Sequence, residues 1–158
     1  QVRLQLFALA YNRDQTEPVA RINQRENGMT DAPERSRAAN SLPEMRRAGV
    51  AVCQSSIAAR ANRDGKAIRR LDLDYGTQSM AYAFAQGQLA YYWLLDEPAE
   101  MNIIRTSNDL NAHWNTWQQE DRNVLRVGFI LAMECTDPIV EPSQAEAWWK
   151  DRLRSAFW

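Results

Sequence analysis

Short apolar runs alternate with longer amphipathic segments along this chain, and the alternation predicts strands separated by helices. The runs that we predict to be strands are 4–10, 50–53, 101–104, 124–133 and an opening strand at 155–158. The segments that we predict to be helices are 18–26, 42–48, 77–96, 106–121 and 142–154. Strands that alternate with helices form parallel βαβ units, so the pattern predicts one α/β domain over residues 1–158.

Capping residues mark where these helices begin. Ser41, with Glu44 three residues later, forms a capping box at the start of one helix. The strongest helical pattern begins at Thr77, and its candidate core residues are Met80, Phe84, Leu89 and Leu94. We expect Gly87 in this helix to permit close packing, since glycine there costs about 1 kcal/mol relative to alanine. The polar segments that we expect to form exposed loops are 29–40 and 60–76.

Composition and charge narrow the class of protein. Of the 158 residues, 45% are apolar and 25% are charged, which is typical of a globular domain. The net charge of −1 argues against a nucleic-acid partner, and no apolar run approaches the ~18 residues of a membrane span. The two cysteines, Cys53 and Cys135, are too few for a disulfide framework. We therefore expect a reduced, cytoplasmic protein.

Glu134 is the clearest candidate for a chemical role. It ends the apolar run 127–133, and the turn signal Asp137-Pro138 follows it. The carboxyl ends of parallel strands are where α/β sheets build their sites. A carboxylate at the edge of a core needs a metal ion or a cation beside it. The structural alternative is that Glu134 caps the following turn or pairs with an arginine. The pattern alone leaves the functional and the structural interpretation open.

Other residue types give weaker signals. The one histidine, His113, shares a helical stripe with Leu110, Trp114 and Trp117, which favours a structural or surface role over a ligand. Ser55-Ser56 follow a predicted strand, but no histidine is placed to activate them. The aromatic groups at 91–93 and 148–149 stand at helical spacing, so we interpret them as core or interface residues rather than a ligand platform.

Two segments of this chain resemble the membrane (renal) dipeptidase family of zinc hydrolases. VGFILAMECTDPI at 127–139 and EAWWKDRLRS at 146–155 are similar to its G-x-x-L-x-x-E-G-x-D-P-[IL] strand and W-x-x-G-[LV]-R helix. SLPEMRRAGVAVCQSSIAARA at 41–61 looks like its L-x-x-L-R-x-G-x-V region. The resemblance runs through the chain and covers the amino-terminal half of the family's barrel. It implies a partial, about half, TIM-type (β/α) barrel with parallel strands.

The resemblance also implies a reaction. Glu134 falls on the glutamate that bridges two zinc ions in the family, and Asp137 falls on the family's D-P turn, where we expect a structural role. Two close zinc ions activate a water and polarise the scissile carbonyl, so the implied activity is hydrolysis of a dipeptide or related amide bond. The implied cofactor is zinc and the implied substrate is a small peptide.

The chain departs from the family pattern at the metal ligands. In the family's register Gln1 replaces a histidine ligand and Arg3 replaces an aspartate ligand. Cys135-Thr136 replaces a Gly-Ala pair. Only Glu134 of the implied ligand set is placed, so we expect the isolated chain to be inactive. We consider a makeshift site of Cys53, Cys135 and Glu134, and an Arg3–Glu134 ion pair where the metal would sit.

A second, non-catalytic function fits the same residues. A half-barrel leaves open strand edges and uncovered apolar surface, which favour pairing with another chain. The alternative is therefore a scaffold or interaction module, natural or engineered, that forms a homo-oligomer or joins a missing second half-barrel. The candidate contact residues are Trp93, Phe157 and Trp158.

Overall fold

The computed structural model describes residues 4–62, 73–98, 100–119, 125–150, 153 and 155–157. The helices are α1 (Leu4–Tyr11), α2 (Val19–Arg25), α3 (Leu42–Arg47), α4 (Gln78–Asp96), α5 (Ser107–Gln119) and α6 (Pro142–Lys150). The strands are β1 (Val52–Ala58), β2 (Arg60–Ala61), β3 (Asp74–Tyr75), β4 (Met101–Ile103), β5 (Val127–Glu134) and β6 (Ser155–Phe157). Across these described residues, no helix is both long enough and apolar enough to cross a membrane.

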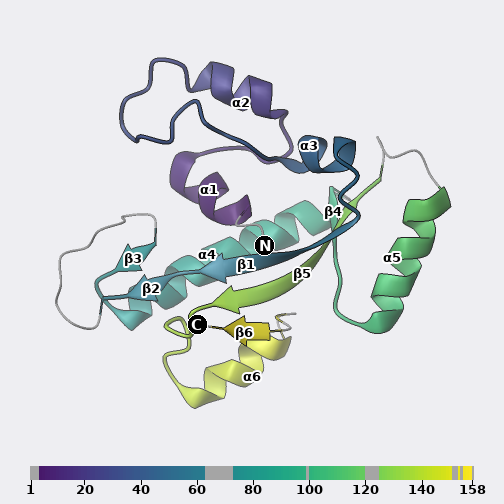
Figure 1. Ribbon diagram of the computed structural model, residues 1–158. Coiled ribbons are helices and arrows are strands. Elements are labelled where there is room, and N and C mark those ends of the chain that lie inside the picture. Colours follow the sequence, from purple (N-terminus) through teal and green to yellow (C-terminus); the bar gives the residue numbers. More distant parts are fainter. Residues whose placement is uncertain are drawn as a thin grey trace.

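Strand β5 lies in the middle of the main sheet (Figure 1). All of strand β1 pairs with one edge of β5. On the opposite edge, β4 pairs with the first part of β5 and β6 with its last part. Every pairing is parallel, so the predicted α/β class with parallel strands is confirmed. The sheet is open, and β2 and β3 form a separate parallel pair.

Helix α4 supplies much of the core on which the sheet packs. It begins where the sequence predicts a helix, and Thr77 caps it: the Thr77 hydroxyl accepts a hydrogen bond from the Met80 amide. Of the predicted core residues, Leu89 is buried, but Met80 is 54% exposed and Leu94 is 63% exposed. The buried stripe takes a different course around the helix, along Ala81, Ala85, Gln88, Leu89, Tyr92 and Leu95.

The prediction that Gly87 permits close packing is wrong. A Cβ built there would meet only the Leu9 side chain, at 3.9 Å, and the residue is exposed. The buried stripe passes on the other side of α4, so this glycine lies outside the tightly packed face.

Polar side chains from α4 complete the hydrogen bonds of β1. The Gln88 amide donates to the Ala58 carbonyl (2.6 Å) and accepts from the Ala58 amide (2.9 Å). Ser55 and Tyr92 share a hydrogen bond in the core, and burial raises the pKa of Tyr92. The Gln88 side chain thus makes the two backbone hydrogen bonds that a neighbouring strand would make. It satisfies both the amide and the carbonyl of Ala58 at the end of β1.

The predicted first strand, residues 4–10, is wrong: this segment is helix α1, which packs against α4 and β1. A short apolar run is ambiguous between a buried strand and a buried helix. Here leucine and alanine dominate and β-branched residues are absent, so the local preference is helical. In Figure 1, α1 lies alongside β1 on the side away from β5.

Two further boundaries differ from the sequence prediction. The strand predicted at 50–53 begins later and is longer, because the turn after α3 uses Gly49 (φ +76°) and a bond from the Val50 amide to the Met45 carbonyl. At the start of α3, Ser41 donates to the Glu44 carboxylate instead of completing a capping box with the backbone. The Glu44 carboxylate accepts from the Val19 amide, which joins α3 to α2.

His113 holds α5 against the sheet. Its Nε2 donates to the Ala51 carbonyl (2.9 Å), and its Nδ1 accepts from the Asn102 amide (2.9 Å), which fits the structural role that we predicted. The ring lies directly over Gly128 of β5. A Cβ at Gly128 would lie 2.5 Å from Ile104 Cδ1 and 2.9 Å from His113 Nε2. Glycine is therefore required here by close approach.

A buried ion pair organises the segment before α3. Arg13 and Glu26 are 5% and 2% exposed, and their side chains form two bonds of 2.7 and 2.8 Å. Arg35 (3.1 Å) and the Ser36 amide (2.8 Å) also donate to the Glu26 carboxylate. The hydrogen bond from Arg13 is the main cause that lowers the pKa of Glu26 to about 2. The 26–41 loop is thus fastened to the end of α1.

We expect Gly128→Ala to lower the free energy of unfolding by about 1–3 kcal/mol, because the added methyl group must displace Ile104 and a doubly hydrogen-bonded His113. Urea denaturation of the variant measures this loss. The matched control is Gly76→Ala, where a Cβ meets no atom of the described residues within 4 Å and the free energy of unfolding should change by no more than about 0.5 kcal/mol. An equal loss in free energy of unfolding at the two positions would contradict the close approach of Ile104 and His113 to Gly128.

We expect Glu26→Gln to lower the free energy of unfolding by about 3–5 kcal/mol, because it leaves the buried Arg13 without its counter-charge. Glu26 has a lowered folded-state pKa, so its stabilisation is present above its ordinary pKa of 4.5 and is lost as the pH falls toward about 2. Urea midpoints measured through that window should fall less in Glu26→Gln than in the parent chain. The control Glu146→Gln removes an exposed ion pair and should change stability by less than about 1 kcal/mol.

Candidate functional site

Glu134 lies where the sequence predicts it, at the carboxyl end of β5. Its register partners are Ala58 at the end of β1 and Phe157 at the end of β6. The residue is half-buried, and the strand before it is almost completely buried. Because all three strands are parallel, their carboxyl ends meet at one edge of the sheet. The Glu134 carboxylate is therefore carried by the middle strand at the edge where α/β proteins build their sites.

A short turn connects Glu134 to the rest of the chain. The Ile139 amide donates to the Thr136 carbonyl (2.9 Å), which closes the turn around Asp137-Pro138. The Asp137 carboxylate accepts a hydrogen bond from the Ala61 amide (3.0 Å), 76 residues earlier. Asp137 therefore binds backbone, as predicted for a structural residue, and the partner is in β2. This bond fixes the turn after β5 against the segment that follows β1.

Cys135 has an unusual backbone conformation for its residue type. Its φ is +66°, in the left-handed region that favours glycine. A side chain in this region is strained, so a strained residue lies directly after Glu134. The cysteine side chain is half-buried in the turn.

The makeshift site of Cys53, Cys135 and Glu134 is wrong. Cys53 is the second residue of β1 and pairs with Phe129, whereas Glu134 pairs with Ala58 at the far end. Five residues of strand separate the two levels, which is roughly 16 Å at 3.3 Å per residue. The proposal assumed that β1 ends at Cys53, and it continues to Ala58. Burial also raises the pKa of the Cys53 thiol to about 12, which disfavours the thiolate that metals bind.

The described residues do not form a zinc site. No group of three or more histidine, cysteine, aspartate or glutamate side chains gathers in the part of the chain that the structure describes. Zinc takes about four ligands, and Glu134 provides one carboxylate. Gln1 and Arg3 lie outside the described residues, so the predicted ion pair of Arg3 with Glu134 stays a prediction.

The other candidates from the sequence are core residues. Ser55 and Ser56 are completely buried, so neither hydroxyl faces a substrate. Tyr92 and Trp148 are buried and Trp93 is half-buried, as predicted for core aromatics, whereas Trp149 is 59% exposed on α6. The side chain of Phe157 and the whole of Trp158 lie outside the described residues.

The fold and this strand end define a mixed α/β protein with an open parallel sheet and a carboxylate at the carboxyl edge. No known protein-family model and no curated protein matches this chain. The dipeptidase resemblance therefore rests on the motifs at 41–61 and 127–155 alone.

We expect Cys135→Gly to raise the free energy of unfolding by about 0.5–1 kcal/mol. Glycine removes a left-handed penalty of about 1–2 kcal/mol but adds freedom to the unfolded chain. Chemical denaturation under reducing conditions measures the difference. The same replacement at Cys53, which lies within β1, should instead destabilise by about 1 kcal/mol. A loss of stability at both positions would contradict the strain at Cys135.

Proposed function

We propose that this chain is related to the membrane (renal) dipeptidases and forms about half of a (β/α) barrel around Glu134. The observation that carries the proposal is the strand end itself: a carboxylate on the middle parallel strand, then a left-handed residue, then an Asp-Pro turn. The succession resembles the family's E-G-x-D-P pattern, except that Cys135 stands at the glycine, and its left-handed backbone is one that glycine adopts readily. The implied activity of the lineage is metal-dependent hydrolysis of a small peptide.

The parallel pairing supports a half-barrel in part. Strand β5 pairs in parallel with β1 on one edge and with β6 on the other, and α6 comes between β5 and β6, as in a TIM-type barrel. The order departs from a barrel at β4, which precedes β5 in the chain but pairs with the edge of β5 that β6 also uses.

The residues present do not fit the zinc that the family uses. Zinc, when held by the family's complete ligand set, activates the attacking water. In this chain Gln1 and Arg3 occupy two of the implied ligand positions, and glutamine binds zinc poorly while arginine repels it. We therefore propose that the isolated chain does not hydrolyse dipeptides, and that Glu134 is retained from a metal-binding lineage.

A non-catalytic interaction module is the second candidate. The observations that favour it are the open sheet and the exposed large apolar side chains Leu94 (63%) and Trp149 (59%). Open strand edges and apolar surface promote association. In this alternative the chain forms a homo-oligomer or binds a second half-barrel, with no substrate of its own.

Elemental analysis of the purified chain after zinc exposure and dialysis tests the metal prediction. We expect less than one zinc per chain and no hydrolysis of a dipeptide, because the described side chains do not gather three potential ligands around Glu134. Close to two zinc ions per chain, lost in Glu134→Gln, would overturn the inactive assignment and restore the hydrolase. The matched control is Glu146→Gln, on the exposed face of α6.

Sedimentation velocity on the same samples separates the two candidates. An oligomer that dissociates in Trp149→Ala supports the interaction module, and a monomer at high concentration contradicts it. The oligomeric state does not depend on zinc. A failure of the zinc prediction and a failure of the interaction-module prediction can therefore be told apart.

A further inference from the structure

An Asn-Gly pair, Asn27-Gly28, forms the turn that follows α2. The pair occurs once in the sequence. Both residues are exposed, and Gly28 has a φ of +83°, in the left-handed region that glycine adopts readily. A Cβ built at Gly28 would meet no atom of the described residues within 4 Å, so the space beside this peptide bond is open. In Figure 1, α2 and the loop after it lie beyond α1, on the side away from the sheet.

The polar atoms of this pair are available for reaction. Among the described residues, the Gly28 amide donates no hydrogen bond and the Asn27 side chain forms none. Asn23 in α2 is the opposite case, since its Nδ2 donates to the Ala38 carbonyl (3.1 Å) and its Oδ1 accepts from the Ala38 amide (2.7 Å). A side-chain amide that is bonded through both atoms cannot turn toward the next backbone nitrogen. The Asn27 amide has no such restraint from the described residues.

We propose that Asn27-Gly28 is a site of spontaneous deamidation that yields isoaspartate. The Gly28 backbone nitrogen attacks Asn27 Cγ and forms a C–N bond. The bond from Cγ to Nδ2 breaks, and Nδ2 leaves as ammonia with the proton that the Gly28 nitrogen loses. Water then opens the resulting succinimide, and attack at Cγ gives aspartate while attack at the backbone carbonyl carbon gives isoaspartate. Glycine favours the first step because no side chain crowds its nitrogen.

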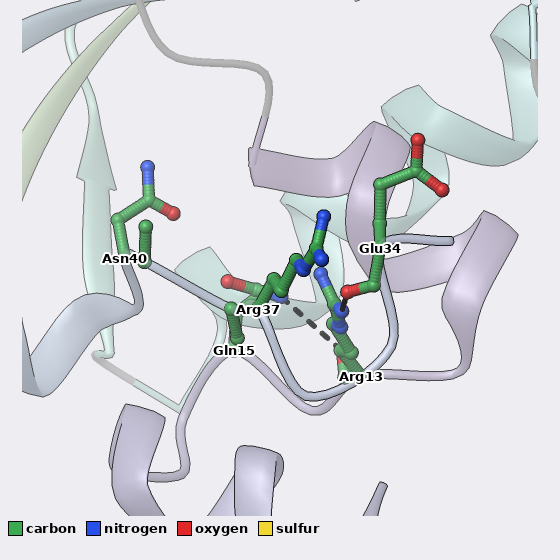
Figure 2. Close-up of a pocket in the computed structure, with 7 residues that line it drawn as sticks. Arg13, Gln15, Glu34, Arg37 and Asn40 are labelled. Carbon is green, nitrogen blue, oxygen red and sulfur yellow. Dashed lines mark hydrogen bonds between the residues drawn. The ribbon is translucent and has the colours of Figure 1, made fainter. Parts of the chain in front are cut away.

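The residue before this pair, Glu26, fastens the whole 26–41 loop. Its carboxylate forms two bonds with Arg13, of 2.7 and 2.8 Å. Arg13 also reaches Glu34 of the same loop, where its Nη2 donates to the backbone carbonyl (2.7 Å), as Figure 2 shows. The position of the Glu26 backbone therefore decides whether the loop stays joined to the end of α1.

Isoaspartate at position 27 disturbs that backbone directly. The Met29 amide donates to the Glu26 carbonyl (3.0 Å), and this bond closes the turn around Asn27-Gly28. Isoaspartate places an additional carbon in the main chain between the two bonded groups, so the turn must change shape. It also adds a negative charge next to the Glu26 carboxylate. Deamidation thus weakens the ion pair of Glu26 with Arg13, and this inference does not rest on the dipeptidase proposal.

Peptide mapping by mass spectrometry, after incubation of the full chain in heavy-oxygen water at mildly alkaline pH, tests the site. We expect Asn27 to take up labelled oxygen at least ~10-fold faster than the exposed Asn40, which corresponds to a barrier lower by roughly 1.4 kcal/mol. Asn23, bonded through both amide atoms, should take up none. Both aspartate and isoaspartate should be found at position 27. A rate at Asn27 no higher than at Asn40, or aspartate as the sole product, would overturn the proposal.

Thermal unfolding of the separated products tests the effect on the ion pair. The isoaspartate form should unfold about 2–4 °C below the parent chain. Asn27→Asp adds the charge and keeps the main chain, so its midpoint should fall less. The control Asn27→Gln, whose longer side chain does not form the succinimide, should stay unconverted and keep the parent midpoint.

The same conversion in Glu26→Gln should lower the midpoint less than in the parent chain, because the ion pair is already lost. Equal midpoints for the isoaspartate form and the parent chain, or an equal fall with and without Glu26, would contradict the link to the ion pair. If Glu26→Gln does not fold, the comparison of the isoaspartate form with Asn27→Asp decides: an equal fall in both would contradict the change in the turn.

Discussion

The hydrogen bonding of β5 on both edges is the constraint on which the rest of this structure depends. Strands β1, β4 and β6 each pair with β5, and among the described residues none of the three pairs with another strand. The faces of β5 are buried at nearly every position, so its backbone must be satisfied within the sheet. Gly128 lets His113 and α5 approach one end of β5, and the other end delivers Glu134 to the carboxyl edge. The position of Glu134 is thus a consequence of the sheet.

A second centre of organisation lies in the segment before α3, and it is electrostatic. Two charged side chains, Arg13 and Glu26, are buried there at a desolvation cost that only close pairing offsets. The Glu26 carboxylate accepts from two arginines and the Ser36 amide, so a loop with little regular structure has a defined course. The conformation of this loop therefore has an electrostatic origin, in the pairing of Glu26 with Arg13.

Local signals in the sequence predicted what local physics determines. The helix predicted over 77–96, the start of α5 at Thr106 and the buried strand before Glu134 are all present. Predictions failed where long-range packing decides. Leu94 is exposed because the stripe of α4 that faces the sheet is set by its neighbours. The buried ion pair of Arg13 with Glu26 was missed for the same reason, because no spacing in the sequence records that contact. The strand predicted at 4–10 failed for a local reason, because an apolar run is ambiguous and its leucine and alanine residues favour a helix.

The strand end depends on groups that the described residues do not bring to it. Glu134 lies at the carboxyl edge of the sheet, where no group of three or more potential metal ligands gathers among the described residues. A zinc site at this edge would therefore need further ligands from elsewhere, because zinc takes about four. The left-handed backbone of Cys135 strains the turn directly after Glu134, so the course of the chain beside this carboxylate is held at a local cost in stability.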